Sequence, residues 1–282
     1  MYRIVQRILF ILLILSFALF GLGYYRTRVL RDSDGPRITM EEEAIIVSVR
    51  DSEQSILRGI QAYDRKDGDV TSSLVLQEMS NFIEKGRRQV TVAAFDSDNN
   101  VAKATREIRY GDYVSPHFSL KEPLSFPIGT QESRFADVVS VQDCLDGDLS
   151  GEVTVSLENA DLYADTSNES SFRMVYSVIN SAGDVAELSV TVDLYSPSHY
   201  NRGTRLLLSQ YLIYLERGAQ FDPWAYVAGM EKYEEAIPLD RRLVRISNPV
   251  DTSYPGVYEV QYTVMEEESE NTTQIRLVVI VE

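Results

Sequence analysis

Three segments of the chain alternate apolar and polar side chains with a period of two residues. In the segment 258–264 (YEVQYTV), the Tyr and Val side chains face one side, and the Glu, Gln and Thr side chains between them face the other. The segment 172–178 repeats the alternation, and the segment that starts at Val90 takes the same place in the first copy. This is the period of a half-buried antiparallel strand. A polar turn and a closing strand follow each time, at 102–110, 185–194 and 272–281, so each pair predicts a β-hairpin.

These hairpins belong to a repeat. The loop 64–71 (DRKDGDVT) returns 79 residues later as 143–150 (DCLDGDLS), and the segment 90–102 returns 84 residues later as 174–186. A third copy starts at Tyr258, and loops of different length explain the drift in spacing. Short strands with turn signals, at about 80 residues per unit, predict Ig-like Greek-key β-sandwiches. The expected fold class is therefore all-β: three tandem Ig-like Greek-key β-sandwiches behind an N-terminal transmembrane helix.

The joints between the copies also repeat. Tyr113 and Tyr195 each follow a closing strand, and each is followed within three residues by a proline. These joints predict domain boundaries near 112/113 and 196/197. The expected organisation is a cytoplasmic stub and transmembrane anchor or signal peptide at 1–25, a stalk at 26–35, and Ig-like domains at 36–112, 113–196 and 197–282.

Three motifs carry a family resemblance. The two DxxDGD loops, the run 250–264 (VDTSYPGVYEVQYTV) and the hairpin 180–186 (NSAGDVA) are similar to the pesticidal crystal protein Ig-like domain family, which occurs in tandem on extracellular bacterial proteins. The resemblance covers residues 36–282. The first two copies lack the PGxY segment, and the third has lost the DGD loop. The resemblance implies an Ig-like fold, with no enzymatic activity and no fixed ligand.

The N-terminal segment differs from the rest. Residues 8–23 are apolar or small and carry no charge, and Tyr24 and Tyr25 extend the run to eighteen residues. As a helix this run is about 27 Å long, close to the thickness of a hydrocarbon core. Gly21 and Gly23 also offer the small-x-small pattern of a cleaved signal peptide, which would give a secreted protein. We favour a single-pass anchor through residues 8–25, with the C-terminal domains outside the cell, because the apolar run is long for a signal peptide.

Composition and charge exclude several function classes. The 282 residues carry 27 Lys and Arg against 43 Asp and Glu, a formal charge of −16 that would be repelled by nucleic acid phosphates. One Cys cannot form an internal disulfide, and two His leave little material for His-based catalysis. The GxSxG turn of a serine hydrolase is absent from the sequence. We therefore expect a protein that is not an enzyme and holds no cofactor.

The aspartate loops are the sharpest candidate site. Closely spaced carboxylates around a Gly turn suit a hard cation such as Ca²⁺, although the bidentate Glu of an EF-hand is missing. The competing interpretation is a structural turn in which Asp side chains cap backbone N–H groups and Gly takes a positive φ, and we favour it on turn chemistry. The candidate metal ligands are Asp64, Asp67, Asp69, Asp143, Asp146 and Asp148.

A second candidate lies in the third copy. If Phe221, Ala225 and Val227 fill the core side of a strand, alternation places Trp224 and Tyr226 on the outer face. Such an aromatic pair can stack on a sugar or anchor a protein contact. The alternative, that Trp224 closes over the sandwich edge as part of the core, is favoured because Trp is highly buried on average.

Together these patterns predict a non-enzymatic, membrane-anchored extracellular Ig-like protein that acts as a cell-surface binding, adhesion or spacer module. The alternative is a carbohydrate-binding or accessory component of a cell-envelope enzyme or polysaccharide system. The expected partners are the membrane, through residues 8–25, and a surface protein or glycan of unknown identity. Nucleic acid is not expected.

Overall fold

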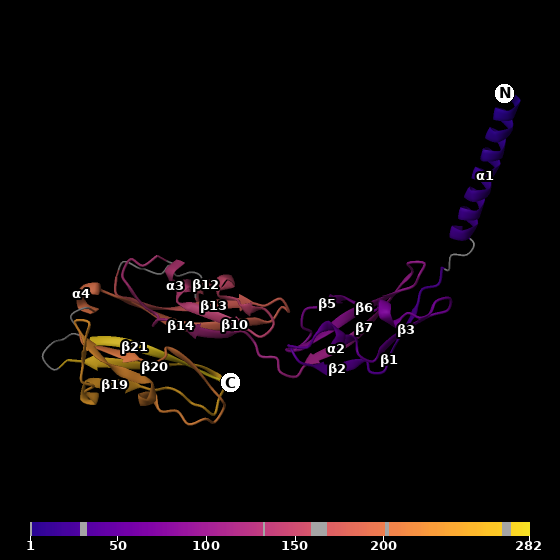
Figure 1. Ribbon diagram of the computed structural model, residues 1–282. Helices are drawn as coiled ribbons and strands as arrows, with labels where there is room; N and C mark the ends of the chain where they lie inside the picture. Colours follow the sequence, from indigo (N-terminus) through magenta and orange to yellow (C-terminus); the bar gives the residue numbers. More distant parts are fainter. Residues whose placement is uncertain (1, 29–32, 132, 159–167, 201–202, 267–271) are drawn as a thin grey trace. The chain divides into compact units, whose positions relative to one another are not determined.

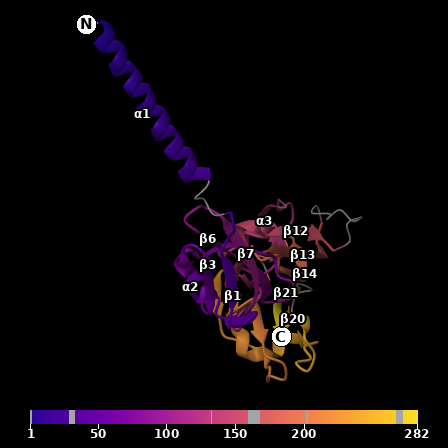
Figure 2. The same ribbon diagram turned by 90° about the vertical axis from the view of Figure 1, so that its right-hand side faces the viewer.

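The computed structural model describes residues 2–28, 33–131, 133–158, 168–200, 203–266 and 272–282. Its first element, α1 (Tyr2–Arg28), is one unbroken helix in both views (Figure 1, Figure 2). Within it, Arg3–Tyr25 forms a stretch of 23 residues that is long and apolar enough to cross a membrane. A signal sequence has the same properties, so length and composition alone do not separate the two.

The first sandwich consists of seven strands in two sheets, ordered β1-β3-β4 and β2-β7-β6-β5. The second strand, β2, runs parallel to the last strand, β7, and the other pairs are antiparallel. The elements are β1 (Arg37–Met40), β2 (Ala44–Val47), α2 (Glu53–Leu57), β3 (Ile60–Asp64), β4 (Gly68–Asp69), η1 (Thr71–Ser73), β5 (Val75–Met79), β6 (Arg87–Phe95) and β7 (Val101–Tyr110).

The second sandwich repeats this arrangement with sheets β11-β10-β8 and β12-β13-β14-β9, and β9 runs parallel to β14. Its elements are β8 (His117–Leu120), β9 (Ser125–Pro127), α3 (Ser133–Asp137), β10 (Val139–Asp143), β11 (Gly147–Asp148), η2 (Ser150–Glu152), β12 (Thr154–Leu157), β13 (Ser170–Ile179) and β14 (Val185–Tyr195).

The third sandwich has sheets β15-β17-β18 and β16-β21-β20-β19, and β16 runs parallel to β21. Its elements are α4 (Pro197–Tyr200), β15 (Arg205–Leu208), β16 (Leu212–Leu215), η3 (Pro223–Tyr226), β17 (Val227–Lys232), β18 (Glu235–Ile237), η4 (Arg241–Leu243), β19 (Val244–Ser247), β20 (Gly256–Met265) and β21 (Thr272–Val281). The predicted fold class of three tandem sandwiches is confirmed.

The alternating strands place their side chains as the sequence pattern predicts. On β20, Val260, Tyr262 and Val264 are buried, while Gln261 and Thr263 between them are only partly covered. The hairpin partner β21 pairs with β20 along its full length. Burial of every second side chain supplies the hydrophobic contribution that holds such a two-sheet domain together.

The first sandwich, in the compact unit 1–112, buries an arginine side chain against its main sheet. Arg106 on β7 is 2% exposed. Its Nε donates to the carbonyl of Glu42 (3.1 Å), and its Nη1 donates to the carbonyls of Ile56 (2.9 Å) and Arg58 (2.7 Å). These hydrogen bonds to main-chain oxygens fasten α2, the residue that follows it and the segment between β1 and β2 to the main sheet.

The second and third sandwiches together form one compact unit, 113–282. Strand β14 of the second sandwich contacts β20 of the third, and the two sandwiches lie side by side (Figure 1). Leu212 and Val278, from the third sandwich, are buried in the hydrophobic core cluster of the second. The joint near residue 196 therefore connects two sandwiches that share an apolar interface.

Candidate functional sites: the aspartate loops and an aromatic groove

The two DGD loops are tight hairpin turns of the same geometry. Asp64 pairs with Gly68 across β3 and β4, and Asp143 pairs with Gly147 across β10 and β11. Both glycines have a φ of +78°. Residues with a Cβ rarely adopt this left-handed backbone conformation. The turn therefore requires a glycine at this position of each loop.

The first Asp of each loop caps the turn. One oxygen of Asp64 accepts hydrogen bonds from the backbone N–H groups of Lys66 (2.8 Å) and Asp67 (2.9 Å). In the second loop, one oxygen of Asp143 accepts in the same way from Leu145 and Asp146, both at 2.8 Å. Both caps are buried, which favours these bonds over bonds to water.

The third Asp of each loop accepts hydrogen bonds from the first residue of the short helix that follows, η1 in the first sandwich and η2 in the second. Asp69 accepts from the backbone N–H of Thr71 (2.9 Å), and Asp148 accepts from the backbone N–H (3.0 Å) and hydroxyl (2.5 Å) of Ser150. Hydrogen bonds from the side chain and then the backbone of Thr71 lower the pKa of Asp69. Ser150 lowers the pKa of Asp148 in the same order. Both carboxylates are held charged as structural acceptors.

The middle Asp of each loop fastens it to the neighbouring hairpin. Asp67 accepts from the backbone N–H and hydroxyl of Ser97, both at 2.9 Å, and these bonds lower its pKa. Asp146 accepts from the same two groups of Ser181, both at 2.6 Å. The hairpin that closes each of the first two sandwiches is thereby tied to its DGD loop.

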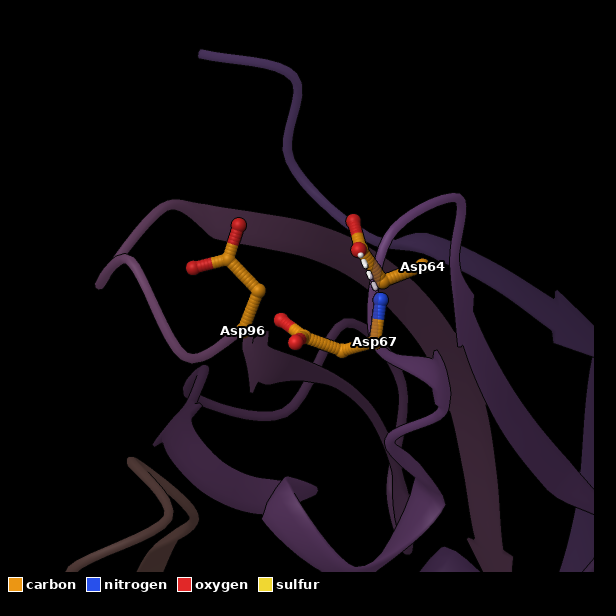
Figure 3. Close-up of side chains that lie close together, drawn as sticks. All are labelled: Asp64, Asp67 and Asp96. Carbon is orange, nitrogen blue, oxygen red and sulfur yellow. Dashed lines mark hydrogen bonds between the residues drawn. The ribbon is translucent and has the colours of Figure 1, made fainter. Parts of the chain in front are cut away.

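Sequence reasoning missed one member of this arrangement. Figure 3 shows that Asp96, at the end of β6, lies beside Asp64 and Asp67, and one carboxylate oxygen from each of the three lies within 4.8 Å of the others. Asp69 is not part of this cluster. The signal was present in the repeat alignment, because Asp96 and Asn180 occupy equivalent positions in the segments 90–102 and 174–186.

The second sandwich has an amide where the first has a carboxylate. Asn180 donates from Nδ2 to the second oxygen of Asp143 (3.2 Å) and to the hydroxyl of Tyr113 (2.8 Å). The Tyr113 hydroxyl in turn donates to Asp184 (2.7 Å). Burial, followed by the hydrogen bond to Asp184, raises the pKa of Tyr113, which keeps this phenol neutral. Whether either loop binds a metal ion stays a prediction.

Trp224 and Tyr226 lie on a short helix instead of a strand. Asp222 caps η3 by accepting from the backbone N–H of Trp224 (3.0 Å), and Pro223 occupies its first turn. This start signal overrides the expected strand alternation, because Pro and an Asp cap favour a helical turn. The expectation that Ala225 fills the core side is wrong, since Ala225 is exposed. Phe221, Trp224 and Tyr226 all pack partly buried against the third core.

Trp224 is also covered on its outer face. The guanidinium of Arg241, on η4, lies 4.6 Å from the centre of the Trp224 ring. A cation over an indole face is attracted by the ring quadrupole. Trp224 is therefore partly buried at the edge of the third core, with a charged side chain over its ring.

Phe221 and Tyr226 line a surface groove, which we call the aromatic groove. Their ring centroids are 5.9 Å apart and the ring planes are inclined by 31°. Polar groups surround the two rings. The other lining residues are Gly218, Ala219, Gln220, Asp222, Ala225, Asn248, Val250 and Thr252.

His117 and Cys144, whose side chains are of types that can serve in catalysis, make structural contacts. The His117 ring packs against Tyr214, with centroids 4.3 Å apart, and its Nε2 lies 3.2 Å from a Glu282 oxygen. The Cys144 thiol lies 3.1 Å from the carbonyl of Val114. Each of these side chains helps to fasten a segment near the start of the second sandwich.

Comparisons with known proteins give only distant likenesses. No protein-family model matches the chain, and no curated protein matches it. A structure of CBM51-2 in complex with GlcNAc and INT domains, from Clostridium perfringens ZmpB, is 18% identical over 54% of this chain and 26% of its own, with a TM-score of 0.23. The protocadherin gamma B4 extracellular domain is 13% identical over 88% of this chain and 50% of its own, with a TM-score of 0.19.

A lipoprotein of Bacteroides thetaiotaomicron is 10% identical over 86% of this chain and 98% of its own, with a TM-score of 0.20. The chain thus spans half or less of the first two structures. Likenesses of this extent identify neither a ligand nor an activity. The resemblance of the repeat motifs to the pesticidal crystal protein Ig-like family stays a prediction.

Proposed function

We propose that this chain is a non-enzymatic surface protein, anchored by α1, whose three sandwiches form an extracellular binding or spacer module. One observation carries the proposal: an apolar helix long enough to span a membrane precedes sandwiches whose acidic loops, His117 and Cys144 make structural contacts. Side chains used in this way hold a scaffold together, and loops on a rigid scaffold are the usual places where partners bind.

The orientation that we propose for the chain in the membrane follows from the length of the segment after α1. A segment of some 250 residues after a single span is translocated largely regardless of its charge, so we place the sandwiches outside the cell. The test is protease added to intact cells that carry a C-terminal tag on the chain. Loss of the tag without lysis supports this orientation, whereas protection until lysis overturns it. A chain recovered in the medium without residues 1–25 would support the secreted alternative.

A second candidate function, carbohydrate binding, is favoured by the aromatic groove. Phe221 and Tyr226 offer apolar ring faces, and Gln220, Asp222 and Asn248 offer amide and carboxylate groups beside them. Sugars present apolar C–H faces and hydroxyl groups, so a ligand site for them combines aromatic surface with a few polar groups.

A glycan array probed with the full chain in detergent tests this candidate. Binding that is lost in Tyr226→Ala and kept in Tyr233→Asn would support glycan recognition at the groove. Tyr233 is exposed on the β17–β18 turn with a φ of +55°, and Asn tolerates that backbone well, so this variant is a matched aromatic control. Absence of binding across the array would leave the spacer or protein-binding role as the proposed function.

A further inference from the structure

We propose that the first sandwich binds one calcium-like divalent cation between Asp64, Asp67 and Asp96, and that the second sandwich does not. This inference is independent of the partner that the sandwiches bind. It concerns a site at the end of the first sandwich where the DGD loop meets the hairpin at 96–100 (Figure 3).

The first observation is a buried oxygen that lacks a partner. Asp64 is 1% exposed, and one of its oxygens accepts two backbone hydrogen bonds. Its other oxygen, Oδ2, is buried and has no hydrogen-bond partner in the described part of the chain. A buried carboxylate oxygen without a donor is costly, so it needs a compensating positive group.

The second observation is the grouping of three carboxylates at this place. One carboxylate oxygen from each of Asp64, Asp67 and Asp96 lies within 4.8 Å of the other two. Calcium–oxygen distances of 2.3–2.6 Å place two ligands on opposite sides of the ion about 4.6–5.2 Å apart, so one ion can reach all three carboxylates. Asp64 and Asp96 are buried while Asp67 is exposed, which leaves an open side for water ligands.

The lysine of this loop forms an ion pair with an aspartate outside the cluster. Lys66 forms its ion pair with Asp98, with Nζ 2.5 Å from the carboxylate. The donor set is made of oxygen atoms alone, which suits hard cations and disfavours zinc or copper. Mg²⁺ demands near-ideal octahedral geometry at about 2.0–2.1 Å, whereas Ca²⁺ accepts flexible oxygen coordination, so Ca²⁺ is the cation that we propose.

The second sandwich provides an internal control. There Asn180 replaces the carboxylate of Asp96 and donates to Asp143, at the oxygen equivalent to the orphan one. The same buried oxygen is therefore satisfied by an amide N–H, and the cluster has one carboxylate fewer. One chain thus contains two versions of the same loop, of which the first requires a cation and the second does not.

Calcium binding by the full chain in detergent, stripped of metal beforehand, tests the proposal. Equilibrium dialysis with labelled Ca²⁺ should give one ion per chain, with a Kd of about 10⁻⁴–10⁻³ M, the range of extracellular calcium modules. Hydrogen exchange should slow on calcium addition in peptides covering 64–70 and 96–100. Peptides covering 143–149 and 180–186 should not change.

Two variants locate the ion. Asp96→Asn copies the amide of the second sandwich, so it should fold without calcium yet bind Ca²⁺ about tenfold more weakly or worse, because affinity follows the number of charged ligands. Asp69→Asn lies in the same loop but outside the cluster and should leave the affinity unchanged. Equal slowing of exchange in both loops, no slowing in either, or full affinity in Asp96→Asn would overturn the proposal.

Discussion

Arg276 on β21 of the third sandwich holds Asp193 on β14 of the second in a two-point ion pair. Its Nε donates to one carboxylate oxygen (2.7 Å) and its Nη2 to the other (3.1 Å). Glu259 lies beside this pair and accepts from the backbone N–H (3.0 Å) and hydroxyl (3.1 Å) of Thr191. A polar network therefore runs next to the apolar contact between the two sandwiches and fixes how they pack.

Arg276→Met should loosen this interface. The two side chains are only 18% and 15% exposed, and the substitution leaves a partly buried carboxylate without its cationic partner, so we expect a loss of roughly 1–3 kcal/mol in the free energy of unfolding. Urea unfolding followed by Trp224 fluorescence measures it. The control is Arg242→Met, whose ion pair with Asp240 is at the surface and should matter little. Equal stability of wild type and Arg276→Met would show that the apolar contact alone holds the unit.

Arg106→Met should destabilise the first sandwich selectively. The substitution keeps an apolar stem but removes the donors to three main-chain carbonyls, which predicts a loss of roughly 2–4 kcal/mol. Hydrogen exchange in peptides of β6 and β7 should accelerate, while exchange in β20 and β21 stays the same. Lys103→Met, at an exposed position on the same strand, is the matched control.

Acid should weaken the DGD loops. Asp69 and Asp148 have lowered pKa values in the folded chain, so the unfolded state binds more protons below its own Asp pKa of about 3.9. The stabilisation from these groups is fully present above that pH and is lost as the pH falls through their folded pKa values. Denaturation midpoints measured from about pH 6 to about pH 2.5 should fall on acidification.

The double variant Asp69→Asn with Asp148→Asn should have a lower denaturation midpoint than the wild type near neutral pH. Its midpoint should also fall less steeply as the pH is lowered. Glu187→Gln, at an exposed position on β14, should leave the profile as it is in the wild type. If the double variant kept the full acid dependence, the titrating groups would lie elsewhere in the chain.

Trp224 should behave as a half-buried lid. Acrylamide, which is neutral, should quench its fluorescence less than that of free tryptophan and more than that of a core residue. Trp224→Ala should cost the third sandwich roughly 1.5–3 kcal/mol, below the range for a fully buried aromatic. Trp224→Phe, which keeps most of the apolar contact, should cost less. Quenching as strong as in free tryptophan, with no loss of stability in Trp224→Ala, would contradict the lid.

The hairpins were predictable because their signal is local. Alternation over seven residues, as in 258–264, decides which side chains of β20 enter the core. The cluster around Asp64 was only partly predictable, because its third carboxylate comes from a different hairpin and only the fold brings Asp96 beside the loop. Strand alternation fails at Trp224 because Pro223 and the Asp222 cap start a short helical turn there, and this local signal overrides the alternation.

The interface between the second and third sandwiches was missed although the sequence carries a sign of it. The run 277–281 (LVVIV) is apolar at every position, whereas a strand with one solvent face alternates. Leu277, Val279 and Val281 enter the third core, and Val278 is buried against the second. A strand that is apolar on both faces has a partner on both faces, and only the folded chain shows which one.

The parallel strand pair in each sandwich determines how a pull on the two ends of the domain is distributed over its hydrogen bonds. Strand β2 runs parallel to the last strand β7, as β9 does to β14 and β16 to β21, so the chain enters a sandwich at one end and leaves it at the other. A pull on the two ends slides such a pair lengthwise and loads its hydrogen bonds together, whereas a hairpin pulled at its open end peels one bond at a time. A sandwich pulled at its two ends should therefore stay closed until several of these hydrogen bonds break together.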